Sequence, residues 1–320
     1  MYFESFSVNY MPLLESYEPL IRLIGFMNKL KAGLLFSRTM SENGKLSRFW
    51  IQELTRPAFE DWLDNEPAPV VIVGIGAIEQ HGTHLPLGTD SLGAREFIHE
   101  VAEKTNSVCI HPCWPGYSPH HMSFPGTVTF SVDTLLNILL DTIESFAVHG
   151  IKRFVLINHH GGNSNIMSLA AQIAKRDFNV MVATPHGPSG TELAKKIEDR
   201  MHRYFEVHSG PRETAYALHY FPELVEMWRL EDWESGVVIP DELQEFMDPD
   251  REDFELVNQV FNACLGPNTE DITTTGQYAT SDPRKAEPEE AAARMEETVN
   301  FMVEFIELWK SIPVPACYRD

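Results

Sequence analysis

The sequence predicts an α/β fold: a single domain with a mostly parallel β-sheet flanked by helices. Two apolar runs of β-forming residues, 70–75 and 153–158, are continuous, which is typical of strands covered on both faces in a parallel sheet. Each run leads through a glycine-containing turn into a segment with a helical pattern, the alternation expected of β-α-β units. A chain of 320 residues can bury one large core of this kind, although length alone also allows two modest domains.

The other elements of the domain follow in chain order. Ser131 is expected to cap a strongly apolar helix over 132–149, and Gly150 is expected to stop it. The inner face of that helix comprises Leu135, Leu139, Ile143 and Phe146. The remaining predicted helices span 49–63, 91–104, 164–176, 188–205, a segment ending at 220, and 288–311, and short strands are predicted at 107–111 and 180–184.

Residues 1–46 are interpreted as an N-terminal helical extension, and residues 47–320 as the main domain. The segment 17–36 is apolar but too often interrupted by charged residues to span a bilayer. It is interpreted as an amphipathic helix that docks on the domain or on a neighbouring subunit, with a membrane-surface helix as the alternative. No basic region leads into an apolar core at the N-terminus, so we expect no secretory signal and a cytoplasmic protein.

The composition narrows the classes of partner. With 47 acidic and 25 basic residues, the formal net charge is −22, which disfavours nucleic acid or an anionic membrane as a main partner. The same acidity could instead reflect solubility or a saline habitat. The four cysteines lack the paired short spacing of a zinc site, and their low density suits a reducing compartment.

Three potential metal ligands follow the first predicted strand. Glu79 and His81 are two residues apart, so in an extended segment both side chains leave the same side of the backbone. Asp90 can return across a loop that contains glycine and proline, with a carboxylate able to touch one ion or bridge two. The alternative interpretation is a polar loop after a buried strand.

Two further candidates, His160 and Glu213, make a metal site more convincing than a polar loop. His160 follows the second buried strand, where open α/β sheets place their ligands. The adjacent Gly161-Gly162 pair lacks the context of a nucleotide-binding motif. Three carboxylates and two imidazoles suit zinc, manganese or iron(II), and five ligands fit two ions bridged by Asp90. A water between two such ions becomes hydroxide near neutral pH and attacks an electrophilic carbon.

Four motifs in the correct order resemble those of the creatininase (creatinine amidohydrolase) family, over roughly residues 48 to 310. The motifs are Gly76-Ala-Ile-Glu79-Gln-His81-Gly-Thr-His84-Leu-Pro-Leu-Gly-Thr-Asp90, Gly116-Tyr-Ser118-Pro-His-His121-Met-Ser-Phe-Pro-Gly-Thr, Asn158-His-His160-Gly-Gly-Asn163 and His208-Ser-Gly-Pro-Arg-Glu213-Thr. The resemblance implies a single α/β domain at 47–320, a two-metal hydrolytic site and, frequently, a hexamer. It also implies that Glu79, Asp90 and His160 hold one ion, and that His81 and Asp90 hold the other.

The resemblance has one departure and suggests the catalytic residues. Creatininase has a glutamate two places after the histidine that matches His160, and Gly162 stands there in this chain. We therefore expect Glu213 to supply the fifth ligand and the pocket to differ from that of creatininase. His208 matches a family histidine that carries protons to the leaving group, a task suited to an imidazole. The alternative for His208 is a histidine that only supports a ligand through a hydrogen bond.

His84, Ser118, His121 and Asn163 are predicted to bind substrate. The alternative for His84 and His121 is a hydrogen-bonded loop histidine, and the alternative for Asn163 is a cap on the following helix. Ser118 lacks the GxSxG context of a serine nucleophile.

These observations together predict a metal-dependent amidohydrolase of a cyclic amide or related small amide. Two divalent ions are expected, zinc first, with manganese or iron as alternatives. Hydrolysis of a carbon–carbon bond in a keto-inositol is the second candidate function, and a non-catalytic oligomeric binding protein is the third. The expected partners are a small-molecule substrate and further copies of the chain in a hexamer, with neither nucleic acid nor membrane.

Overall fold

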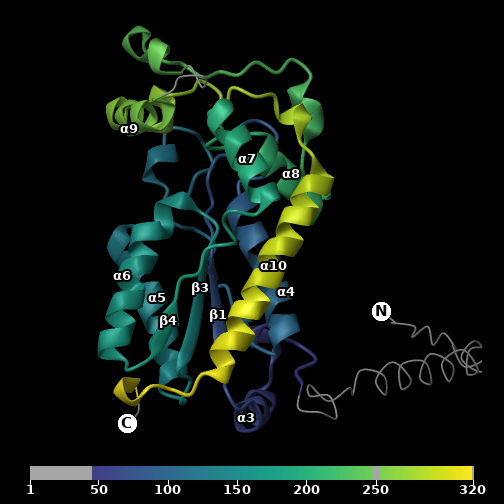
Figure 1. Cartoon of the computed structure of the whole chain (residues 1–320), viewed down its shortest axis with the longest axis vertical. Coiled ribbons are helices and arrows are strands. Elements are labelled where there is room, and N and C mark those ends of the chain that lie inside the picture. The colour runs from purple at the N-terminus through teal and green to yellow at the C-terminus, as the bar shows by residue number, and fades with distance from the viewer. Residues whose placement is uncertain (1–44, 248–252, 319–320) are drawn as a thin grey trace, which may run out of the picture.

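Four parallel strands form the centre of the fold, in the order β2-β1-β3-β4 (Figure 1). The computed structural model describes residues 45–247 and 253–318. The strands are β1 (Val70–Ile75), β2 (Val108–Ile110), β3 (Arg153–Asn158) and β4 (Met181–Ala183). Every pairing in this sheet is parallel. The predicted α/β fold with a parallel sheet is therefore confirmed, and β1 and β3 have the predicted bounds.

Helices cover both faces of the sheet, which explains why its central strands are apolar throughout. α5 (Val132–Ala147) and α6 (Ser164–Asp177) lie on one face, and α4 (Thr89–Thr105) and α10 (Pro288–Ser311) lie on the other (Figure 1). All six residues of β1 are buried. Strands enclosed in this way need apolar side chains on both faces, because neither face meets water.

The helix α5 follows its predicted pattern closely. The Ser131 hydroxyl accepts a hydrogen bond from the Thr134 amide and so caps the first turn. The four residues of the predicted inner face are the buried residues of this helix. α10 also packs as expected, with Val299, Met302 and Ile306 buried against the main core.

Several helix boundaries differ from the expectation; for example, α7 (Glu192–Arg203) is shorter than the predicted 188–205. The predicted helix over 49–63 is divided into a 3₁₀ turn, Ile51–Glu53, and α3 (Arg56–Asn65), because Thr55 caps a new helix that has proline in its first turn. α4 begins at Thr89, two residues earlier than predicted, so that Asp90 lies in its first turn and not in the preceding loop. The remaining helices are α7 (Glu192–Arg203), α8 (Pro211–Tyr220) and α9 (Phe254–Cys264).

The predicted N-terminal helix over 17–36 lies outside the described residues. Leu46 and Phe49, which follow that segment, pack into the main hydrophobic core. Within residues 45–247 and 253–318, no helix combines the length and apolar character needed to cross a bilayer.

We predict that Leu139→Ala lowers the free energy of unfolding by about 2–5 kcal/mol, because its side chain is fully buried in the main core. Leu308→Ala is the matched control, since Leu308 is 67% exposed on α10. The control should change stability by no more than about 0.5 kcal/mol. Equilibrium urea denaturation measures both effects, and equal losses in the two variants would contradict this account of the core.

Candidate metal centre

The five predicted metal ligands converge beyond the carboxyl ends of β1 and β3. Glu79 and His81 lie in the turn after β1, and His160 directly follows β3. Asp90 and Glu213 lie in the first turns of α4 and α8. Four of the five are buried, and Glu213 is half-buried. The fold thus gathers two turns and two helix starts around one small region.

Asp90 divides the other four residues into two groups. Its Oδ2 lies 3.2 Å from His160 Nδ1, which is 3.3 Å from Glu79 Oε1. Its Oδ1 lies 3.4 Å from His81 Nε2, which is 3.9 Å from Glu213 Oε2. Each oxygen of Asp90 therefore faces one imidazole and belongs to one donor set.

Three atoms of this cluster are buried without a hydrogen-bond partner among the described residues. They are Glu79 Oε2, His81 Nε2 and Asp90 Oδ2. A buried polar atom without a partner costs about 1–3 kcal/mol, so such atoms are uncommon in folded proteins. A divalent cation would satisfy all three, and the mixed oxygen and nitrogen donors are those that zinc and manganese accept. The residues present fit a metal site.

Backbone carbonyl groups orient two of the histidines toward this cluster. His81 Nδ1 lies 3.1 Å from the Glu79 carbonyl oxygen, and His160 Nε2 lies 3.0 Å from the Tyr117 carbonyl oxygen. A carbonyl oxygen can only accept, so each of these ring nitrogens donates. The other nitrogen of each ring then faces the carboxylates, the arrangement seen around metal-bound histidines.

The carboxylates also control the protonation of the same rings. Burial lowers the pKa of His81, but the negative charge of Asp90 outweighs this effect and raises that pKa to about 9. Burial also lowers the pKa of His160, but the carboxylates of Asp90 and Glu79 outweigh this effect and raise that pKa to about 11. Without a cation, a proton therefore occupies the ring nitrogen that faces the carboxylates. Metal binding must displace these protons.

Glu213 is held in its ionised form by its own helix start. Its Oε2 accepts a hydrogen bond of 2.7 Å from the Ser209 amide, and its Oε1 accepts one of 2.9 Å from the Arg212 guanidinium. Burial raises the pKa of Glu213, but the charge of Arg212 outweighs it and gives a net lowering. An ionised carboxylate held by two hydrogen bonds is suited to bind a cation.

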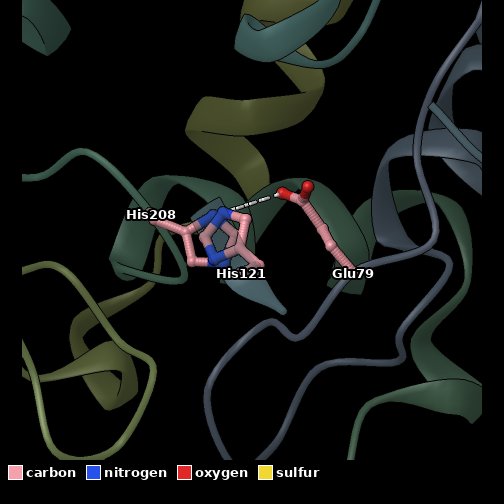
Figure 2. Close-up of side chains that lie close together, drawn as sticks. All are labelled: Glu79, His121 and His208. Carbon is pink, nitrogen blue, oxygen red and sulfur yellow. Dashed lines mark ion pairs between the residues drawn. The ribbon is translucent and has the colours of Figure 1, made fainter. Parts of the chain in front are cut away.

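His208 lies next to the cluster, with its ring centroid 4.3 Å from that of His81. Its Nε2 donates to the Gln80 carbonyl oxygen at 2.6 Å, so its Nδ1 faces Glu79 Oε1 at 3.7 Å and Glu213 Oε2 at 3.9 Å. Burial and the nearby His81 lower its pKa. Figure 2 shows the imidazoles of His208 and His121 together beside the Glu79 carboxylate. His208 therefore presents a neutral nitrogen toward the centre.

A cavity of about 660 Å³ opens over the centre. None of the described residues that line it is lysine or arginine. His121 is among its lining residues, whereas His84, Ser118 and Asn163 are not. Lining residues that the sequence reasoning missed are Tyr117, His120, Asn268, Thr269 and Tyr278. Tyr117 and His120 had a local signal, since they are adjacent to the predicted site residues Ser118 and His121.

The other three predicted substrate-binding residues make contacts inside the protein. His84 Nε2 lies 2.7 Å from the Thr214 hydroxyl, and the Ser118 hydroxyl lies 3.2 Å from His160 Nε2. The Asn163 side chain donates to the Gly76 carbonyl oxygen at 3.0 Å and accepts from the Tyr117 amide at 2.9 Å. The alternative interpretation of Asn163 as a helix cap is wrong, because its side chain makes no cap hydrogen bond. It joins two loops of the site instead.

Comparison with known proteins assigns the family. The family model described as "Creatininase: Creatinine amidohydrolase" matches residues 52–306. The chain belongs to the creatininase family. The crystal structure of a creatininase has the same fold, with a TM-score of 0.62 and 23% sequence identity over 83% of this chain and 100% of that chain. Other creatininase structures with this fold include a form described as Mn (24% identity over 83% of this chain and 100% of that chain, TM-score 0.60) and a mutant described as Zn-Zn type (24% identity, the same shares, TM-score 0.62).

Curated members of the family with related sequences have different names. The 3-dehydro-scyllo-inosose hydrolase of Thermotoga maritima is 26% identical over 54% of this chain and 57% of its own length. The mycofactocin precursor peptide peptidase of Mycolicibacterium smegmatis is 32% identical over 48% of this chain and 59% of its own length. The creatinine amidohydrolase of Pseudomonas putida is 28% identical over 51% and 68%. The chain thus spans less than two thirds of the length of the first two relatives.

Gly162 packs closely against the groups that orient His160. A Cβ atom at Gly162 would lie 2.2 Å from the Tyr117 carbonyl oxygen and 2.5 Å from His160 Nε2. Any side chain there would separate His160 from the carbonyl group that orients it. The backbone of this loop therefore leaves no room for a side chain at residue 162.

We predict that Gly162→Ala weakens zinc binding by about 10–100-fold, the loss usual when a hydrogen bond that orients a metal-binding histidine is disturbed. Gly161→Ala is the matched control, because a Cβ atom at Gly161 would meet nothing within 4 Å. Competition with a chromogenic chelator measures both affinities. Similar affinities in the two variants would show that the Tyr117 contact does not orient His160.

Proposed function

We propose that this creatininase-family protein is a hydrolase that uses two divalent metal ions to cleave the C–N bond of a cyclic amide or a related small amide. The observation that carries the proposal is the pair of donor sets that share Asp90. A carboxylate with one oxygen in each set is the arrangement that a two-metal site requires. The family membership of the chain supports the same reaction class.

In this proposal, Glu79, Asp90 and His160 hold one ion, and His81, Asp90 and Glu213 hold the other. When bound, two such ions polarise a substrate carbonyl group and lower the pKa of water. Zinc is the first candidate, with manganese or iron as alternatives, and the Mn and Zn-Zn descriptions of creatininase structures support the first two. A homohexamer and a cytoplasmic location are part of the proposal as well.

His208 is the proposed proton carrier, and with Glu213 it forms the proposed catalytic pair. Its neutral Nδ1 faces the space between Glu79 and Glu213. This nitrogen accepts a proton as water attacks the carbonyl carbon, and it returns the proton to the departing nitrogen. The hydrogen bond from Nε2 to the Gln80 carbonyl oxygen keeps the ring in place for both transfers.

The cavity supports a small, uncharged substrate. Its described lining offers no lysine or arginine to pair with an anionic group. The proposed substrate-binding residues are His121 at the cavity wall, and His84, Ser118 and Asn163, which act through the residues they contact. An uncharged amide suits a lining without cationic side chains.

A second candidate is hydrolysis of a carbon–carbon bond in a keto-inositol. It is favoured by the similarity to a 3-dehydro-scyllo-inosose hydrolase and by the hydroxyl groups of Tyr117, Thr269 and Tyr278 at the cavity wall. A non-catalytic binding protein is disfavoured, since it has no need for a cluster of buried metal-ligand atoms that lack hydrogen-bond partners.

Comparing kcat/KM for creatinine, cyclic imides, formamides and keto-inositols decides between the first two candidates. No turnover of any amide would refute the leading candidate.

We predict that the metal-loaded protein holds two ions per chain, that Asp90→Ala loses both, and that Glu213→Ala loses one. The reason is that Asp90 contacts both imidazoles, whereas Glu213 belongs to one donor set only. Elemental analysis by mass spectrometry measures the stoichiometry. Glu66→Ala is the matched control, because Glu66 lies outside the centre and its side chain is only 10% exposed. This variant should retain both ions. Two ions in Glu213→Ala would contradict our choice of the fifth ligand.

We also predict that His208→Ala lowers kcat by about 10²–10⁴-fold, the usual contribution of a positioned acid or base. Both ions should remain, because His208 is proposed to move a proton and not to bind metal. His219→Ala, an exposed histidine on α8, is the matched control and should keep full activity. Loss of an ion from His208→Ala would instead identify His208 as a ligand.

A further inference from the structure

Gln80 connects two histidines that come from distant parts of the chain. It stands between two proposed metal ligands and is 4% exposed. Its side-chain Nε2 lies 2.8 Å from His121 Nδ1. Its backbone oxygen accepts the hydrogen bond of 2.6 Å from His208 Nε2. Gln80 thus contacts both of the histidine rings that lie beside the Glu79 carboxylate.

The orientation of the Gln80 amide follows from two backbone groups. Its Oε1 lies 2.9 Å from the Gly82 amide nitrogen, which can only donate. Its Nε2 lies 2.9 Å from the Gly276 carbonyl oxygen, which can only accept. The opposite orientation of the amide would place donor against donor and acceptor against acceptor. The nitrogen of Gln80 therefore faces His121.

This orientation determines which nitrogen of His121 carries the proton. The Gln80 nitrogen has only hydrogens to offer, so His121 Nδ1 must accept, and a neutral ring then carries its hydrogen on Nε2. The Thr269 hydroxyl, 2.8 Å from the same Nδ1, can donate or accept there, so it adapts to the tautomer and does not select it. His121 Nε2 lies 3.4 Å from Glu79 Oε1, and Figure 2 shows the ring beside that carboxylate. His121 is also among the residues that line the cavity.

His208 has the opposite arrangement. Its Nε2 donates to the Gln80 backbone, so a neutral His208 has its free electron pair on Nδ1. The two rings lie 4.4 Å apart between centroids. Two adjacent imidazoles beside one carboxylate therefore offer different groups: His121 offers a donor and His208 offers an acceptor.

We propose that Gln80 is a positioning residue that sets these opposite polarities, so that His121 Nε2–H donates a hydrogen bond to the substrate's carbonyl oxygen while His208 Nδ1 accepts a proton. The carbonyl oxygen gains negative charge when its carbon is attacked, and a prearranged donor stabilises that charge. His121 keeps its proton throughout, and no bond to it is made or broken. The catalytic half of this inference rests on the proposed amide hydrolysis, whereas the hydrogen-bond polarity does not.

The competing role for His121 is metal binding. Ligand atoms of Glu79, His121 and His208 all lie within 4.8 Å of one another and could hold an ion. In that role His121 Nε2 would need its electron pair, and Nδ1 would carry the hydrogen. The Thr269 hydroxyl could accept that hydrogen, but the hydrogen would then lie beside the Gln80 nitrogen, which is itself a donor at 2.8 Å from the same atom. The contacts of Gln80 thus favour a donor over a ligand.

Nitrogen-15 NMR of histidine-labelled, zinc-loaded protein tests the polarity without any substrate. We expect His121 to show a protonated Nε2 and an unprotonated Nδ1, with its signals assigned by their loss in His121→Phe. In Gln80→Glu the carboxylate can only accept, so Nδ1 should gain the proton. Gln172→Glu makes the same chemical change at an exposed position on α6 and should leave the His121 signals unchanged. A protonated or zinc-bound His121 in the parent protein would overturn the inference.

Kinetics on the amide substrate test the catalytic half. Gln80→Glu should lower kcat by about 10²–10³-fold, the effect of losing one donor to a developing negative charge. KM should change little, and both ions should remain. An altered His121 spectrum with unchanged kcat would overturn the role of His121 as a donor to substrate. Because the spectra need no substrate, they judge the polarity even if amide hydrolysis itself is refuted.

Discussion

The site depends on the placement of one buried carboxylate, that of Asp90. Its two oxygens face two different imidazoles at 3.4 and 3.2 Å, and this alone separates the surrounding donors into two sets. Asp90 lies in the first turn of α4, where the partial positive charge of a helix start favours a carboxylate. A Cβ atom at Gly76 would lie 2.4 Å from the Ser91 amide nitrogen, so the missing side chain lets α4 begin against the turn after β1. Close packing of backbone on backbone therefore brings Asp90 to Glu79.

Main-chain carbonyl groups determine how the histidine rings of the site are oriented. The carbonyl oxygens of Glu79, Tyr117 and Gln80 each accept from one histidine, and so each selects which ring nitrogen faces the centre. These carbonyl groups lie in turns beyond the strand ends, where the sheet leaves them without a partner strand. The turns that follow the strands thus supply the acceptors that orient the imidazoles. His121 differs because a side-chain amide donates to it.

The concentration of buried polar groups is tolerated because the rest of the domain is strongly apolar. The main core contains buried residues from every strand of the sheet and from the helices on both faces. The centre carries buried atoms without hydrogen-bond partners, each a cost to folding until a cation satisfies it. Under the proposed function, that cost becomes part of the affinity for metal, since binding stabilises only the folded chain.

Local signals in the sequence account for much of the fold and for the identity of the donors. The bounds of β1 and β3 and the buried face of α5 could be predicted because continuous apolarity and helical spacing are local patterns. The start of α4 could not, because Gly88 precedes it and offers no capping side chain. The lining residues Thr269 and Tyr278 also lacked a local signal, since only the path of the folded chain brings them over the centre.

The sequence by itself determined a parallel α/β domain, the family and a set of carboxylates and imidazoles suited to metal, because periodicity and ligand chemistry belong to short segments. Only the tertiary structure decided which oxygen of Asp90 faces which ring, and which histidine donates and which accepts. Those properties depend on contacts between residues far apart in the chain, such as Gln80 with His121 and with His208. A shift of less than an ångström is enough to make or break a hydrogen bond, and no spacing in a sequence specifies distances at that scale.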